Sequence, residues 1–223
     1  MPLSAILNLA RASLLGGDIT CTATTPYLLA DGPQGVTVTS SGDNLAVSPS
    51  ADGLAELVTR RFHLDLDASA VTAAFERSAL TDVLEPNAWV RRPAAADLWS
   101  YCLIFLCGAN PDAPSVTKLF AELGQADGQL QIAPGPTDVL AAGDRRIMSC
   151  GVAPHRVANV LGLARAFAAT PERYDEVSLR ALPADEAVAR VAELPHIGST
   201  RARAISSTAL GHDDALPDLA RPG

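Results

Sequence analysis

Residues 185–210 constrain the fold more than any other part of this chain. The letters DEAVARVAEL and GSTRARAISSTAL both have helical character, and only Pro-His-Ile separates them. Proline cannot continue a helix, and glycine adopts backbone conformations that other residues resist. The sequence therefore predicts two helices joined by a tight hairpin at residues 194–198. Gly198 supplies the conformational freedom, and Ser199 and Thr200 lie in the first turn of the second helix.

Two kinds of ion binding follow from such a hairpin, and a plain connection between packed helices is the alternative. Backbone amides at the start of the second helix favour an anion such as a DNA phosphate. Carbonyls on the other side of the turn can hold a monovalent cation, Na⁺ or K⁺. The residues predicted to contact a DNA backbone are His196, Gly198, Ser199 and Thr200. The carbonyls predicted to hold the cation are those of Ala192, Leu194 and Ile197.

Charge and composition lower the expectation of a nucleic-acid partner. The net charge is −8, and most of the excess acidic charge lies before residue 151, with no strong basic patch in the sequence. The four cysteines lack the spacing of zinc ligands, so buried reduced thiols are expected, without a cofactor. No apolar run approaches the roughly 20 residues of a membrane span. We expect a cytoplasmic protein.

The first part of the chain carries the β-strand signal. Residues 1–15 have the pattern of a short amphipathic helix, and residues 20–48 alternate Thr, Val and Ser with period two between turn residues. Leucine, valine and phenylalanine at helical spacing predict a helix over residues 54–62. A further extended stretch and helix follow. We expect a small antiparallel sheet with helices over residues 1–84.

After residue 85 the strand signal disappears. The most apolar run of the chain, residues 97–107, predicts a buried central helix. Further helices are predicted over residues 114–123, 137–142, 154–169 and from Pro183 onward, with a polar loop over residues 124–135. The fold class is thus α+β: an N-terminal module over residues 1–84, followed by an all-α domain over residues 85–223.

The string ALPADEAVARVAELPHIGSTRARAISSTALGHDDAL resembles the helix-hairpin-helix of the 3-methyladenine DNA glycosylase II (AlkA-like) family. The preceding GDRRIMSCGVAPHRVANVLGLARAFA and the Thr- and Val-rich N-terminal segments resemble that family in the same order. The resemblance implies a small β-rich first domain and a glycosylase-like helical domain. It also implies that the family's last helices are missing here. Members of the family flip an alkylated base out of DNA and cleave its glycosidic bond.

The resemblance also implies where the working parts should lie, and several of them differ. The catalytic aspartate matches Asp218 only if two residues after Pro217 are deleted. The family's pocket aromatics match Thr200 and Ala204. Its DNA-wedging side chains match Ala109 and Asn110, and the family usually has glycine where His196 stands. His196 is a second candidate for a catalytic group, as a general base.

These differences favour a glycosylase scaffold that acts outside DNA repair. We expect one subunit of a heteromeric enzyme in small-molecule, specialised metabolism, with a second protein chain over an uncovered apolar face around residues 99–105. The chain alone is not expected to be an active DNA glycosylase. The residues predicted to contribute to a small-molecule substrate site are Trp89, Arg91, Arg92, Trp99, Tyr101, Arg145, Arg146 and His196.

Two alternatives remain open at this stage. One is a DNA glycosylase that excises alkylated purines, with Asp218 as its catalytic residue. The other is a non-enzymatic DNA-binding module that uses the hairpin alone, for which weak, sequence-independent and salt-sensitive binding is expected.

Overall fold

The computed structural model describes residues 21–29, 32–41, 44–48, 54–62, 73, 97–108, 113–127, 130–212 and 215. The chain divides into two compact units. The N-terminal unit comprises Met1–Thr25 and Gly35–Ala94, and the helical unit comprises Pro26–Gln34 and Ala95–Gly223. The predicted helix over residues 1–15 and the predicted domain boundary at residues 84 and 85 lie outside the described residues, so both stay predictions.

The predicted antiparallel sheet is present. Its strands are β1 (Cys21–Leu29), β2 (Gly32–Ser41) and β3 (Asn44–Ser48), in that order across the sheet. β2 and β3 are antiparallel, with Thr37 opposite Ser48 and Ser41 opposite Asn44. Val36 and Val38, two residues apart on β2, are both fully buried, as the period-two pattern requires of one face. The predicted helix over residues 54–62 is α2 (Leu54–Phe62), and its Leu54 and Val58 are buried.

The helical unit is built around α5 (Leu98–Cys107), the predicted central helix. Asp97 caps its first turn by accepting hydrogen bonds from the backbone N–H and the hydroxyl of Ser100, each at 2.6 Å. α5 packs against α8 (Pro154–Ala169), and both helices supply buried apolar side chains to one core. Five residues of α5 are buried: Leu98, Cys102, Leu103, Leu106 and Cys107.

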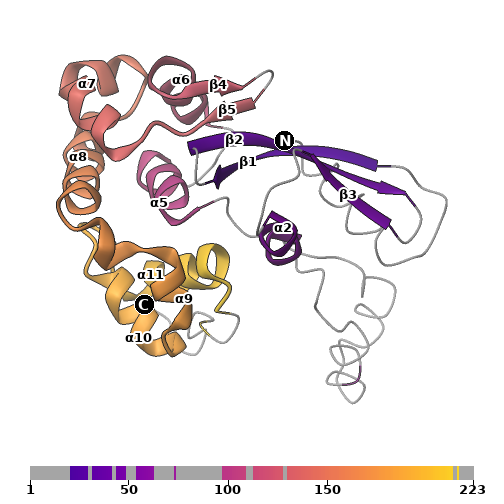
Figure 1. Cartoon of the computed structure of the whole chain (residues 1–223). Coiled ribbons are helices and arrows are strands. Elements are labelled where there is room, and N and C mark those ends of the chain that lie inside the picture. The colour runs from indigo at the N-terminus through magenta and orange to yellow at the C-terminus, as the bar shows by residue number, and fades with distance from the viewer. Residues whose placement is uncertain are drawn as a thin grey trace. The chain divides into compact units, whose positions relative to one another are not determined.

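The other helices of this unit gather at two ends (Figure 1). α6 (Pro114–Leu123) and α7 (Pro136–Ser149) lie at one end, and α8 runs from there to the other. At the second end lie a 3₁₀ turn (Pro171–Tyr174) and the helices α9 (Glu176–Ala181), α10 (Ala184–Ala192) and α11 (Ser199–Ile205). α11 continues into a π-helical segment, Ser206–Leu210. Among the described residues, no helix is long and apolar enough to cross a bilayer.

The prediction of a polar loop over residues 124–135 was wrong in part. Two three-residue strands, β4 (Gln125–Asp127) and β5 (Leu130–Ile132), form an antiparallel hairpin there, so the helical unit is not purely α. Gln125 lies opposite Ile132 and Asp127 opposite Leu130. Strands this short do not carry a recognisable alternation of apolar and polar residues. Their pairing follows from the burial of Ile132 against α6.

α7 is longer than its predicted extent of residues 137–142. It reaches Ser149, with a kink at Gly143, whose backbone angles are φ 66° and ψ 179°. Those angles are accessible to glycine and strongly disfavoured for other residues. The helical pattern resumes after the kink, and Ile147 is fully buried. The predicted helix ended at Ala142, whereas the chain bends at Gly143 and the helix continues.

Candidate functional site

The hairpin between α10 and α11 is present as predicted, and two buried side chains hold it. The N–H of Leu194 donates to the carbonyl of Val191 at 3.1 Å, and the N–H of Ile197 donates to the carbonyl of Leu194 at 3.0 Å. The side chains of Leu194 and Ile197 are both 2% exposed. The tip between them therefore faces solvent while its two flanks are anchored in the core.

The strained position of the hairpin is His196 and not Gly198. His196 has φ 65° and is the only non-glycine residue with a positive φ among the described residues. Gly198 has φ −77° and ψ 171°, an extended conformation that any residue adopts. The prediction that Gly198 supplies the conformational freedom was wrong. The turn reaches its left-handed point two residues earlier, at a residue type that tolerates this region better than most.

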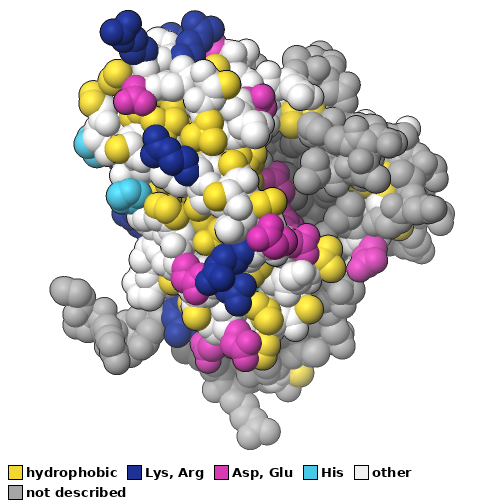
Figure 2. Space-filling model, turned by 60° about the vertical axis from the view of Figure 1, so that its left-hand side comes forward, with side chains coloured by type: hydrophobic (Ala, Val, Ile, Leu, Met, Phe, Trp, Pro, Cys, Tyr) yellow, Lys and Arg dark blue, Asp and Glu magenta, His cyan; other side chains and the backbone are white. Residues whose placement is uncertain are grey.

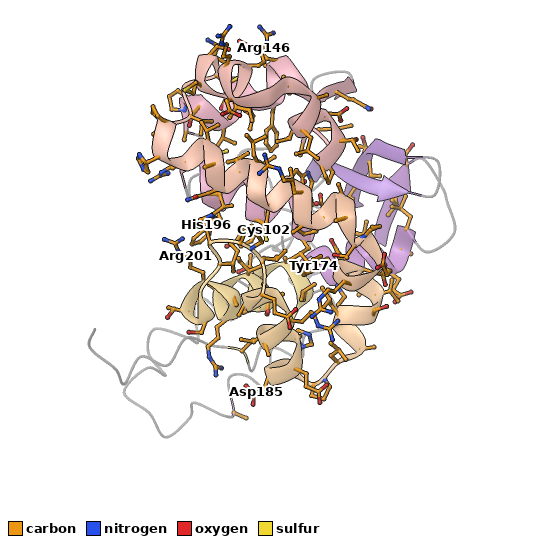
Figure 3. The ribbon with its side chains drawn as sticks, turned by 90° about the vertical axis from the view of Figure 1, so that its left-hand side faces the viewer. Cys102, Arg146, Tyr174, Asp185, His196 and Arg201 are labelled. Atoms are coloured by element: carbon orange, nitrogen blue, oxygen red, sulfur yellow. The ribbon has the colours of Figure 1, made fainter. Side chains whose placement is uncertain are left out.

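Arg201, in the first turn of α11, reaches back to the tip of the hairpin. Its Nη1 donates a hydrogen bond to the carbonyl oxygen of His196 at 3.0 Å. Its guanidinium carbon lies 5.5 Å from the centre of the Phe105 ring on α5, a cation–π contact. Figure 3 shows the Arg201 and His196 side chains close together at the hairpin. Sequence reasoning missed Arg201 and its contact with Phe105, because nothing in the local pattern indicates that a helix residue bonds to the loop before it.

The predicted backbone contacts are accessible. His196, Gly198, Ser199 and Thr200 are all exposed, and a β-carbon built on Gly198 would meet nothing within 4 Å. Two hairpin carbonyls already accept hydrogen bonds, that of Leu194 from Ile197 and that of His196 from Arg201. A carbonyl oxygen has a second lone pair, so the cation site at Ala192, Leu194 and Ile197 stays a prediction.

Two predicted substrate residues on α5 have structural partners. The indole N–H of Trp99 donates to the carbonyl of Pro134 at 2.7 Å, and its ring meets Phe167 edge-on at 5.2 Å. Tyr101 lies beside Phe105, with ring centres 6.5 Å apart. Trp99, Tyr101 and Phe105 are half-buried, whereas an uncovered apolar face was expected at these residues. Trp99 therefore joins the aromatic core, and the tyrosine supports the ring beneath Arg201.

The structure does not bring the predicted arginines together with the hairpin. Arg146 forms an ion pair with Glu122 at 3.1 Å, and Figure 3 places Arg146 at one end of the helical unit, away from His196 and Arg201. Arg145 is exposed on the same helix. The remaining predicted residues, Trp89, Arg91, Arg92 and Asp218, lie outside the described residues, as do the wedge positions Ala109 and Asn110.

The second hairpin helix carries no aromatic side chain at the two pocket positions. Thr200 is exposed and Ala204 is half-buried. The aromatic ring that the structure places against this helix is Phe105 of α5, and the cation on it is the protein's own Arg201. An aromatic face already covered by a guanidinium is not free to stack on a cationic base.

A partly buried ion pair ties α9 to α5 and to the π-helical segment. Glu176 accepts a hydrogen bond from the backbone N–H of Leu98, the first residue of α5, and pairs with Arg180. Arg180 also donates to the carbonyl of Ala209 at 3.1 Å. The Ser206 hydroxyl is fully buried there, without a hydrogen-bond partner in the described structure. This junction fixes the far end of the hairpin helix and was not predicted from the sequence.

The prediction of buried reduced thiols is confirmed for Cys102, Cys107 and Cys150, which are free and buried. Burial, and then the nearby charges of Asp97 and Glu176, raise the pKa of Cys102 well above its usual value. Burial raises the pKa of Cys107 to about 12. At neutral pH these groups are therefore thiols and not the reactive thiolates.

We expect these three cysteines to resist iodoacetamide at pH 8 in the folded protein and to react within minutes after denaturation in urea. Alkylation is mapped by mass spectrometry after digestion. A matched control is Ser149→Cys, which places a thiol at an exposed position beside buried Cys150 and should react without denaturant. Rapid alkylation of Cys102 or Cys107 in the folded protein would contradict their placement in the core.

Comparison with known proteins gives a fold but no sequence family. No protein-family model matches the chain, and no curated protein shows significant sequence similarity to it. Among solved structures, the 3-methyladenine DNA-glycosylase from Archaeoglobus fulgidus superimposes with a TM-score of 0.67 at 15% identity, covering 93% of this chain and 76% of that one. The chain has the fold of a helix-hairpin-helix DNA glycosylase.

Two further structures support the same glycosylase-like fold. The Clostridium acetobutylicum 8-oxoguanine glycosylase/lyase in its apo form has a TM-score of 0.66 at 13% identity, covering 93% of this chain and 76% of that one. MBOgg1 in complex with a low-affinity DNA ligand has a TM-score of 0.65 at 14% identity, covering 90% and 73%. At these identities the likeness shows the fold alone, since one fold hosts many functions.

Proposed function

We propose that this glycosylase-like chain acts outside DNA repair, as one subunit of an enzyme in small-molecule metabolism. The observation that carries the proposal is the composition of the second hairpin helix. Thr200 and Ala204 occupy the positions where the resembled family places pocket aromatics. Each lost stacking or cation–π contact removes about 1 kcal/mol of binding to a cationic base. Discrimination of an alkylated base from a normal base would then be largely lost.

The distribution of surface charge supports the same proposal. On the face shown in Figure 2, Lys and Arg side chains lie scattered among Asp and Glu side chains, and they do not form one continuous basic surface. The protein as a whole is acidic, with a net charge of −8. A protein that scans DNA gains most of its non-specific affinity from phosphate contacts. Binding of a small-molecule substrate does not require a continuous basic surface.

The partner chain is part of this proposal and needs its own test. Among the described residues, the exposed large apolar side chains are Met148 on α7 and Val177 on α9, helices at opposite ends of the helical unit (Figure 1). Size-exclusion chromatography of the chain, alone and co-expressed with the product of a neighbouring gene, should show a stable heteromer. A soluble monomer that is unchanged by co-expression would contradict the partner.

Base release from DNA distinguishes the proposal from repair activity. We expect the intact chain to release no purine from duplex DNA that contains N-methylated purines, under conditions where a known 3-methyladenine glycosylase releases them. Release is measured by chromatography of the free base. Asp218→Asn is the matched variant. Release by the natural chain that this variant abolishes would establish the glycosylase alternative and overturn our proposal.

One observation favours a second candidate function, DNA binding without base excision. The exposed Arg201 has no carboxylate partner among the described residues, and it lies beside exposed backbone at Gly198 and Ser199. A guanidinium in that position can contact a phosphate. Binding to random-sequence duplex DNA, measured by fluorescence anisotropy at low salt and falling steeply with added salt, would support this candidate. No binding at about 20 mM salt, where charges are only weakly screened, would exclude this candidate.

A further inference from the structure

The tip of the hairpin adopts a conformation that its residue does not favour. A left-handed backbone brings the β-carbon of an L-residue close to its own carbonyl oxygen, which glycine avoids because it has no β-carbon. His196 has φ 65°, yet the residue is exposed and its ring makes no hydrogen bond within the part of the chain that the structure describes. Histidine tolerates this conformation better than most residues but at a higher cost than glycine, so a contact from elsewhere in the structure would stabilise it.

Arg201 provides a contact at the right atom. The carbonyl oxygen of His196 points toward Arg201 and accepts from its Nη1 at 3.0 Å. A rotation of His196 to a negative φ would turn the neighbouring peptide and change the direction of the groups at the tip. A charged donor makes a stronger hydrogen bond than a neutral one, so this contact favours the left-handed state.

The guanidinium also contacts an aromatic ring of the central helix. Its centre lies 5.5 Å from the Phe105 ring, and Phe105 is packed beside Tyr101 on the central helix α5. A long exposed arginine ordinarily loses side-chain entropy when it makes a single hydrogen bond. Stacking on a ring fixed by the core reduces that loss, since the planar guanidinium then has one preferred position.

We propose that Arg201 is a positioning residue that holds the hairpin tip in its left-handed conformation, by bridging the His196 carbonyl to Phe105. The arginine thereby stabilises a conformation that glycine at position 196 would adopt without support. This inference goes beyond the proposed function, because the bridge forms within the protein and sets the shape of the tip before any substrate or DNA arrives. The tip is preorganised, and a ligand does not have to order it.

The competing explanation is that the buried flanks alone hold the tip. Leu194 and Ile197 are anchored on either side of His196, and a segment of three peptide bonds between fixed ends has few conformations. That explanation gives Arg201 only a general stabilising role, independent of the residue at position 196. The two explanations therefore differ in whether residues 196 and 201 are coupled.

A double-mutant cycle on the intact chain tests the coupling. Arg201→Ala should raise the unfolding equilibrium constant about tenfold when His196 is present and by only about twofold in the His196→Gly background, where the tip no longer needs support. Arg201→Lys keeps the charge but loses the planar guanidinium, so with His196 present its unfolding constant should lie between those of the natural chain and Arg201→Ala. Urea unfolding measures all variants. Equal effects of Arg201→Ala in both backgrounds would overturn the proposal.

A spectroscopic measurement adds a readout that a general loss of stability does not move. The three-bond HN–Hα coupling and the ¹³Cα and ¹³Cβ chemical shifts of residue 196 report its φ directly by NMR. They should change in Arg201→Ala and stay unchanged in Arg203→Ala. Arg203 lies on the same helix and forms only a loose ion pair with Asp185 at 3.7 Å. A left-handed His196 in folded Arg201→Ala would likewise overturn the proposal.

Discussion

Replacing Gly124 with alanine is expected to lower the free energy of unfolding of the helical unit by about 3 kcal/mol or more. An added β-carbon would lie 2.1 Å from the carbonyl oxygen of Ile132 and 2.6 Å from that of Phe120. Both are backbone atoms, which cannot rotate away as a side chain would. The end of α6 and strand β5 would have to separate, and the pairing of Gln125 with Ile132 would be lost.

Urea unfolding followed by far-UV circular dichroism measures this loss. The matched control is Gly198→Ala, because a β-carbon there meets nothing within 4 Å and the backbone has a negative φ. That change should cost about 1 kcal/mol or less, the difference between glycine and alanine as an N-cap. A Gly124→Ala protein as stable as the Gly198→Ala protein would show that β4 and β5 do not pair as described.

Replacing Glu176 with alanine is expected to cost about 2 to 4 kcal/mol of stability. The side chain of Glu176 is 23% exposed and that of its partner Arg180 is 17% exposed. Removing the carboxylate takes away the ion-pair partner at position 176 from a partly buried guanidinium, and it removes the acceptor for the first N–H of α5. Arg180 would also lose the support that keeps it on the carbonyl of Ala209 in the π-helical segment.

The comparison for this substitution is Glu193→Ala, which removes another glutamate that is paired with an arginine. The side chains of Glu193 and its partner Arg173 are each 45% exposed. Exposed ion pairs contribute about 0 to 1 kcal/mol because water and salt screen them. Thermal unfolding of the two variants in parallel should show a large shift only for Glu176→Ala. Equal shifts would mean that the junction between α5 and α9 is not as closely packed as described.

Long elements of this fold could be predicted because their patterns repeat over several turns. The helices over residues 54–62, 114–123 and 154–169 have the bounds that the sequence indicated. The apolar run before Gly108 is likewise the buried α5. The strands β4 and β5 escaped prediction, because three residues give no periodicity and their pairing depends on Gly124, a contact between backbones.

The candidate site was predictable in its position and less so in its interactions. Pro195 and Gly198 marked the hairpin correctly, and their neighbours are exposed as expected. The left-handed residue was assigned to Gly198 because glycine is the usual occupant of that conformation, whereas the structure has it at His196. Arg146 and His196 were predicted to contribute to one substrate site, and the ion pair of Arg146 with Glu122 shows why charge does not indicate spatial proximity.

The left-handed histidine at the hairpin tip has a consequence for the order in which substitutions accumulate. A chain with glycine at position 196 loses little stability when arginine at position 201 is replaced, since its tip needs no bridge. Histidine at position 196 without the arginine would distort the tip. Arginine at position 201 is therefore expected to precede the replacement of glycine by histidine at position 196. Loss of the arginine becomes harmful only once that histidine is present. Among chains of this fold, we expect a residue other than glycine at position 196 to occur together with arginine at position 201.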